Sequence, residues 1–245
     1  MIEKSPFSIE HSNSLCAIIA SMDTEKKSVK TIDINADIGA GFEGENSSYD
    51  EKLVKRITSA NIACGFHGGD PAVMQRSVNF AVKHGVALGA HIGLPGMLGF
   101  EMGDFVVSPK RVYSQLLYQL GALQAFALSC GKRVQHVKLH GALYEQSITD
   151  AALARSVADA VASFDSAIIL LGPVDSKLLK AGSEAGLQVA TEVSVESLDE
   201  LRFDTDSITV AADRPCALRL LDELRLACQK EGISLAPLLQ SHLQE

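Results

Sequence analysis

The sequence predicts an α/β protein in which seven parallel strands alternate with helices and form a closed or nearly closed β/α barrel. Three observations support this. Short runs of β-forming residues recur along the chain, amphipathic stretches separate them, and several of those stretches carry helix start and stop residues. A doubly wound open sheet would leave the same alternating pattern. Both architectures place ligands at the carboxyl ends of the strands.

The predicted strands are short and rich in β-branched or small residues, as buried parallel strands usually are. The stretches between them are long enough for the crossover connection that parallel pairing requires. In chain order the seven strands are Lys30–Asp37, Ser59–Ala63, Val86–His91, Val134–Lys138, Ala167–Leu171, Leu187–Val193 and Ser207–Val210.

The helix boundaries are marked by capping residues, proline and glycine. The start signals are Asp70-Pro71 for a helix to about His84, Ser108-Pro109 for a long helix to about Cys130, Asp150 for the next helix, and Pro215 for a last helix ending near Glu231. Gly85, Gly131, Gly186 and Gly232 follow helical stretches, and we predict that they are C-terminal caps with positive φ.

Length and composition indicate a single barrel domain over residues 29–245, preceded by an N-terminal extension over residues 1–28. The chain has 245 residues, of which 47% are apolar, enough for one large hydrophobic core. The apolar run Leu15 to Ala20 is far shorter than the ~20 residues that cross a bilayer. Acidic residues near the N-terminus do not fit a targeting peptide. We therefore expect a cytoplasmic protein.

The charge balance and the cysteines exclude several function classes. The net charge of -8 repels phosphate backbones and anionic membrane surfaces, so we predict neither nucleic acid nor a membrane as partner. The five cysteines are scattered and show no CxxC spacing, which argues against a disulfide framework or a zinc-thiolate site. The expected ligand is therefore a small molecule, and self-association stays open.

The first predicted strand carries an unusual polar face. Asp33, Asn35 and Asp37 alternate with apolar residues, so a strand points all three side chains the same way, into the predicted barrel. Carboxylates facing inward need a cation, a hydrogen-bond partner or a raised pKa to offset desolvation. The pattern fits a functional site and a structural hydrogen-bond network about equally well.

The fourth strand repeats this pattern with basic residues. His136, Lys138 and His140 share one face, and His140 lies at the strand end, where loops build sites. A buried lysine beside carboxylates could neutralise them or hold the carboxylate of a small acidic substrate. For His136, earlier in the strand, a satisfied core histidine is the preferred interpretation.

The segment between the second strand and the Asp70 helix is a glycine-rich loop that carries His67. Gly68 and its neighbours permit close backbone approach to a ligand, and the following helix N-terminus offers N–H groups suited to an anion. Asp70 itself is predicted to cap that helix rather than to bind a ligand. Cys64 is interpreted as a packing residue, because no activating arrangement accompanies it.

His91 ends the third strand and supplies a third strand-terminal imidazole. The candidate site residues are therefore Asp33, Asp37, His67, His91 and His140. Such a set could bind a divalent cation such as Mg²⁺ or Zn²⁺, or perform general acid and base catalysis. The spacing does not separate these two options.

These segments also carry a resemblance to a known family. The pattern Asp33-x-Asn35-x-Asp37-x-Gly39 is followed by the segments Thr58 to His67, Gly69 to Met74, Gly89 to His91, Tyr118 to Leu123, Arg133 to Lys138 and His140 to Tyr144. Together they resemble the LamB/YcsF family in the same order. The match is specific from Asp33 to Tyr144 and continues more weakly to about Ala217.

The resemblance implies a barrel akin to the polysaccharide deacetylases and the role of the A subunit of 5-oxoprolinase. With B and C subunits, such a protein uses ATP, bound through the complex, to cleave the lactam of 5-oxo-L-proline to L-glutamate. We expect three roles, with some residues in two of them. The catalytic residues are Asp37, His67 and His140; the substrate-binding residues are Asn35, Lys138, Gly68 and His91; and the candidate metal ligands are Asp33, Asp37, His67 and His140.

The chain departs from the family pattern at several positions. Ala40 replaces a carboxylate, and the segments Ile92 to Gly96, Met102-Gly103 and Ala211 to Pro215 differ from their counterparts, while Ser194 to Asp206 is shortened. Two alternatives therefore stay open beside the 5-oxoprolinase role. One is a metal-dependent amidase or deacetylase on the same barrel, and the other is a non-catalytic ligand-binding barrel.

Overall fold

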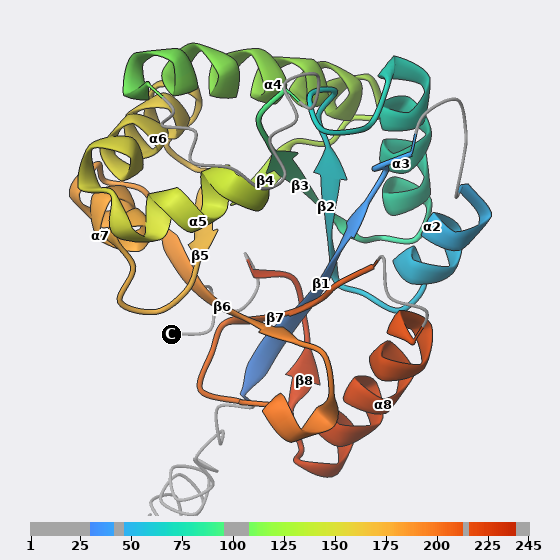
Figure 1. Ribbon diagram of the computed structural model, residues 1–245. Coiled ribbons are helices and arrows are strands. Elements are labelled where there is room, and N and C mark those ends of the chain that lie inside the picture. The colour runs from blue at the N-terminus through green and yellow to red at the C-terminus, as the bar shows by residue number, and fades with distance from the viewer. Residues whose placement is uncertain (1–29, 42–46, 96–107, 213–215, 239–245) are drawn as a thin grey trace, which may run out of the picture.

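The computed structural model describes residues 30–41, 47–95, 108–212 and 216–238. Strands and helices alternate through most of this part of the chain, and Figure 1 shows the helices arranged around the strands. The elements are β1 (Thr31–Ile38), α2 (Ser47–Val54), β2 (Ser59–Ala63), α3 (Pro71–Lys83), β3 (Ala87–Ile92), α4 (Pro109–Ser129), β4 (Val134–Leu139), α5 (Gly141–Thr149), α6 (Ala151–Phe164), β5 (Ile169–Gly172), α7 (Lys177–Glu184), β6 (Val189–Val195), η2 (Leu198–Glu200), β7 (Ser207–Val210), α8 (Ala217–Lys230) and β8 (Ser234–Leu235).

The sheet closes on itself through β1. All pairings are parallel, and the strands follow one another in the order β2-β3-β4-β5-β6-β7-β1, with β1 also paired to β2. Residues Asp33 to Ala36 pair with β7, and residues Asn35 to Ile38 pair with β2. The seven predicted strands are thus confirmed as a closed barrel, and the open doubly wound sheet is excluded.

The helix signals of the sequence are largely confirmed. The Asp70 and Asp150 carboxylates each accept hydrogen bonds from two backbone N–H groups in the first turns of α3 and α6. Ser108 occupies the N-cap position of α4 but makes no side-chain capping bond. The glycines after α3, α4, α7 and α8 all have positive φ, as their predicted capping role requires.

Several short elements were not predicted. The helix α2 is mostly polar, and α5 begins at Gly141, a residue that usually marks a loop. The strand β8 has two residues and pairs only with Thr31 and Ile32 of β1. Residues 1–28 and Pro215 lie outside the described residues, so the N-terminal extension and the proline start of the last helix stay predictions.

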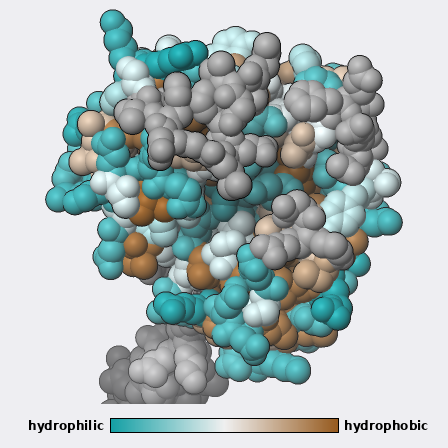
Figure 2. All heavy atoms as spheres, viewed as in Figure 1, coloured by the Kyte–Doolittle hydropathy of each residue, from teal (hydrophilic) through white to brown (hydrophobic). Residues whose placement is uncertain are grey.

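Buried side chains occupy two regions, one between the strands and the helices and one inside the barrel. An apolar layer lies between the strands and the surrounding helices and includes Ile32, Ile34 and Val137, each fully buried. Side chains on the other face of the same strands fill the inside of the barrel, and many are polar. On the face shown in Figure 2, hydrophobic residues occur as scattered patches among hydrophilic ones. No helix among the described residues is long and apolar enough to span a membrane.

Candidate functional site

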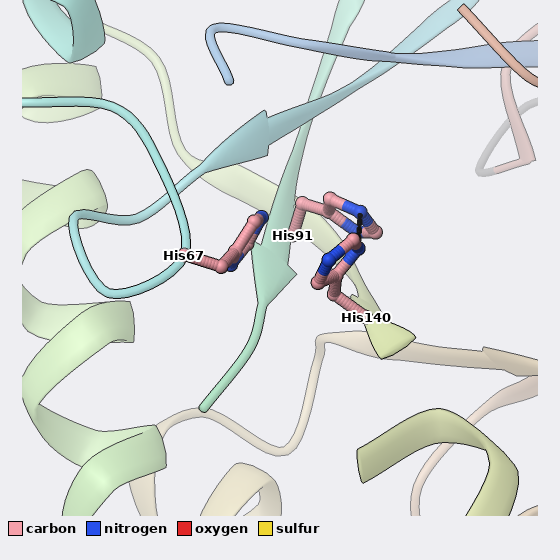
Figure 3. Close-up of side chains that lie close together, drawn as sticks. All are labelled: His67, His91 and His140. Carbon is pink, nitrogen blue, oxygen red and sulfur yellow. Dashed lines mark hydrogen bonds between the residues drawn. The ribbon is translucent and has the colours of Figure 1, made fainter. Parts of the chain in front are cut away.

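Four predicted site residues lie at the carboxyl ends of neighbouring strands. Asp37 is the next-to-last residue of β1, His67 is in the loop after β2, His91 is near the end of β3, and His140 directly follows β4. Because parallel strands end on the same side of a barrel, these side chains converge. Figure 3 shows how the three histidines lie. The structure therefore brings together the three histidines that the sequence placed in different segments.

The three imidazoles form a compact cluster. The His67 and His140 rings stack with centroids 4.1 Å apart, while His91 meets both rings edge-on. Nε2 of His91 lies 3.1 Å from Nδ1 of His140. One nitrogen from each of the three rings can be chosen so that all lie within 4.8 Å of one another. Such a cluster can move protons or hold a metal ion.

Asp37 lies at the edge of this cluster. Its Oδ2 atom is 3.4 Å from Nε2 of His91, and its Oδ1 atom accepts a 2.8 Å hydrogen bond from Asn61. Asn61 also donates to Asn35 at 2.7 Å. Asn61 was not singled out from the sequence, although an asparagine in the small-residue strand β2 was a visible signal. Its amide group fixes the Asp37 carboxylate so that the second oxygen faces His91.

Burial keeps the imidazoles of His67 and His91 neutral. Desolvation, together with the neighbouring His91 and His140, lowers the pKa of His67 to about 2. Desolvation also lowers the pKa of His91 well below its ordinary value, with further contributions from His140 and Lys138. At neutral pH both rings therefore offer an unprotonated nitrogen, the form that accepts a proton or ligates a metal.

The backbone around His67 is tightly packed. A Cβ atom on Gly93 would lie 2.3 Å from Nδ1 of His67, so only glycine fits beside the ring. The fully buried Gln119 side chain holds Gly93 in place by donating to its carbonyl oxygen at 3.0 Å and accepting from its N–H at 3.2 Å. Neither residue was predicted as part of the site, and both act by positioning His67.

Asp33, a predicted metal ligand, belongs to a different layer. It precedes Asp37 by four residues, about 13 Å along a strand. Its carboxylate accepts hydrogen bonds from Thr58, Ser59 and Ser207, and it is fully buried. Burial raises its pKa despite these hydroxyl donors. The structure thus places Asp33 in a hydrogen-bond network apart from the histidines.

Asn35, predicted to bind substrate, is also inside the barrel. It donates to Ser207 at 2.7 Å and accepts from Asn61 and Thr209, and none of its surface is exposed. His136 is likewise buried, and its Nε2 atom lies 2.8 Å from the side-chain oxygen Oδ1 of Asn61. The interpretation of His136 as a satisfied core histidine matches this contact.

Lys138 is paired with an acid that the sequence did not identify. Its Nζ atom donates to Glu192 at 2.7 Å and to Thr209 at 3.0 Å. Burial opposes ionisation of Lys138, but Glu192 and Asp37 outweigh it, so the pKa is raised. The predicted contact between Lys138 and a substrate carboxylate therefore competes with an existing buried carboxylate, Glu192, which is 54 residues away in sequence.

The glycine-rich loop packs closely against the backbone of another segment of the chain. A Cβ atom on Gly68 would lie 2.5 Å from the Ala40 carbonyl oxygen, so the close approach that Gly68 permits is made by the chain itself. The Asp70 carboxylate occupies the N–H groups of Ala72 and Val73 at the start of α3. The predicted anion position at this helix end is therefore already filled by a side chain.

Cys64 packs in the core beside this loop. It is 1% exposed, and burial raises the pKa of its thiol to about 12. A thiol in this state is not a nucleophile at neutral pH. The interpretation of Cys64 as a packing residue agrees with this environment.

Comparison with known proteins identifies relatives that cover most of this chain. The chain is 47% identical over 189 residues to the A subunit of 5-oxoprolinase from Methylococcus capsulatus, covering 77% of this chain and 71% of that protein. It superposes on the lactam utilization protein of Thermus thermophilus with a TM-score of 0.75 and 29% identity, covering 84% and 99% of the two chains.

More distant structures show the same fold. The family 4 carbohydrate esterase PdaA of Bacillus subtilis superposes with a TM-score of 0.50 at 13% identity, over 96% of this chain and 91% of that one. The predicted likeness to the polysaccharide deacetylase fold is thereby confirmed. The LamB/YcsF family model matches residues 32–198, which run from β1 to the first residue of η2 and include the whole histidine cluster. The chain therefore belongs to the LamB/YcsF family.

Proposed function

We propose that this chain is the A subunit of an ATP-dependent 5-oxoprolinase that acts with B and C subunits. The observation that carries the proposal is its 47% identity over 189 residues to a protein named as the A subunit of 5-oxoprolinase. The site supports it chemically, because a carboxylate and neutral imidazoles at one end of a barrel can transfer protons during hydrolysis of an amide.

The reaction requires activation of the substrate. An unstrained lactam is a poor electrophile, so the γ-phosphoryl group of ATP is transferred to its carbonyl oxygen and ADP leaves. One water then adds to the activated carbon, and the ring C–N bond breaks to give an acyl phosphate. A second water hydrolyses the acyl phosphate to L-glutamate and phosphate. Each water must lose a proton, and the ring nitrogen must gain one.

We assign proton transfer to Asp37 and His140. His91 links them, because its Nε2 atom lies 3.4 Å from Oδ2 of Asp37 and 3.1 Å from Nδ1 of His140. His67 stacks on His140 and restricts its ring. Lys138 is not assigned to the substrate carboxylate, since Glu192 already neutralises it inside the barrel.

The test is glutamate release from 5-oxoproline and ATP by this chain combined with B and C subunits. We expect Asp37→Ala and His140→Ala to lower the rate by about 10²–10⁴-fold, the usual contribution of general acid and base groups. The matched control is His84→Ala, because His84 lies at the end of α3, where it contacts Glu51 outside the cluster. If no glutamate is released although the B and C subunits are active with another A subunit, the proposal is refuted.

A second candidate is a metal-dependent amidase or deacetylase that needs no ATP. The histidine cluster favours it, because three imidazoles can hold a catalytic Zn²⁺. Amide hydrolysis by the isolated chain that is abolished by a chelator would support this candidate. Binding of 5-oxoproline without any turnover would instead indicate a ligand-binding barrel.

A further inference from the structure

We propose that His67, His91 and His140 form a binding site for one divalent transition-metal ion, with Asp37 beside its fourth coordination position. The inference rests on the geometry of these four side chains and does not depend on the 5-oxoprolinase role. It also differs from the ligand set expected from the sequence, because His91 joins the site and Asp33 does not.

The atoms nearest one another already have the spacing of metal ligands. Two ligands of a tetrahedral Zn²⁺ with bond lengths of ~2.0–2.1 Å are separated by about 3.3 Å. The distance from Nε2 of His91 is 3.1 Å to Nδ1 of His140 and 3.4 Å to Oδ2 of Asp37. One nitrogen from each of His67, His91 and His140 can be chosen so that these three atoms lie within 4.8 Å of one another. A side-chain adjustment of about 1.5 Å or less would bring His67 to the same spacing.

Unpartnered nitrogens give independent support. Both ring nitrogens of His67 and the Nδ1 atom of His91 are buried without a hydrogen-bond partner among the described residues. His91 is itself only 3% exposed. By contrast, the fully buried His136 bonds Asn61 through its ring. A metal ion would satisfy a His67 nitrogen that the surrounding side chains leave without a partner.

The surroundings hold the ligands in place, as outer groups do at metal sites. Asn61 donates to Oδ1 of Asp37, which leaves Oδ2 toward His91. Gln119 fixes the backbone of Gly93, against which the His67 ring packs. The site is therefore built on strand ends and braced by buried amides.

The donor set selects a class of metal. Three imidazole ligands suit Zn²⁺, Co²⁺, Ni²⁺ or Cu²⁺, whereas Mg²⁺ and Ca²⁺ prefer sites made of oxygen ligands. Zn²⁺ is the ion expected of a tetrahedral three-histidine site, and Co²⁺ is a useful replacement because it absorbs visible light. Of the two ions considered from the sequence, the geometry favours Zn²⁺ over Mg²⁺.

The experiment uses the full chain without ATP or other subunits, stripped with a chelator and dialysed against Zn²⁺ or Co²⁺. We expect one metal per chain by elemental analysis and a ligand-field spectrum typical of four-coordinate Co²⁺. His67→Gln and His140→Gln should each weaken Zn²⁺ binding by at least about 10-fold, the lower range for loss of groups that support a metal site. His84→Gln, which alters a histidine outside the cluster, should bind like the wild type.

Two results would overturn the proposal. One is a wild-type chain that retains no Zn²⁺ and gives no four-coordinate Co²⁺ spectrum. The other is metal binding that folded His67→Gln and His140→Gln variants keep unchanged, which would place the ion elsewhere. Circular dichroism verifies folding, and the wild-type spectrum decides the question even if a variant unfolds. Because the isolated chain is measured, a negative result leaves the 5-oxoprolinase proposal standing.

Discussion

Replacing Lys138 by methionine should destabilise the protein strongly, because it removes the partner of a buried carboxylate. The side chains of Lys138 and Glu192 are only 9% and 2% exposed, and their charged atoms are 2.7 Å apart. Methionine keeps most of the hydrocarbon stem but leaves the Glu192 charge uncompensated. Breaking a buried pair from one side costs about 3–5 kcal/mol, so we expect Lys138→Met to lower the free energy of unfolding by that amount.

Urea denaturation followed by circular dichroism measures this loss and allows a double-mutant cycle. Glu192→Gln should cost a similar amount, since it leaves a buried ammonium group. The double variant should be at least about 2 kcal/mol more stable than the sum of the single losses predicts, because it leaves no unpaired charge.

The matched control is Lys180→Met. Lys180 forms an ion pair with Glu184 on the surface of α7, with side chains 70% and 55% exposed and charged atoms 4.0 Å apart. Such pairs contribute only about 0–1 kcal/mol. If Lys138→Met, like the control, lowers the free energy of unfolding by less than about 1 kcal/mol, the predicted cost of an unpaired buried charge is refuted. Such a result would mean that solvent screens the Lys138 charge.

Three further outcomes follow from contacts in the barrel. Gly89→Ala should destabilise the chain by more than about 2 kcal/mol in urea denaturation, because its Cβ atom would lie 1.9 Å from Nε2 of the buried His136 ring; an unchanged midpoint would contradict that overlap. Burial lowers the pKa of His136 to about 4, so its contribution to stability is complete above the unfolded-state pKa of ~6.5 and falls as the pH drops toward 4. That contribution should decrease by about 2 kcal/mol between pH 7.5 and 5.0, so the total loss of stability over this range should be about 2 kcal/mol smaller in His136→Gln than in the wild type. Asp70→Ala should lower stability by about 1 kcal/mol through loss of the bonds to Ala72 and Val73, whereas Asp70→Asn should retain most of it.

The local features of the barrel could be predicted from the sequence. The strand around Ile34 was recognisable because β-branched residues alternate with polar ones, and the start of α3 because Asp70 precedes proline. These signals act between residues close together in the chain. Elements without such signals escaped prediction, as α5 did when its first residue, Gly141, indicated a loop.

The candidate site was predictable in part for the same reason. Asp37, His67, His91 and His140 each lie at or just after a strand end, and parallel strands bring such positions together whatever the remaining sequence. Which polar side chains inside the barrel contact the histidines, and which form a separate hydrogen-bond network, was not predictable. Asp33 shares a strand face with Asp37, yet its carboxylate accepts hydrogen bonds from the hydroxyl groups of Thr58, Ser59 and Ser207 instead of facing the histidines.

The sequence by itself therefore determined which segments form strands and helices and which polar side chains point into the barrel. The tertiary structure decided which of those side chains meet. Lys138 binds Glu192, and Asn61 binds Asp37, because barrel closure and strand register bring β4 near β6 and β1 beside β2. Contacts across a barrel depend on register and on the packing of all strands at once, and neither quantity is encoded in the spacing of residues along one segment.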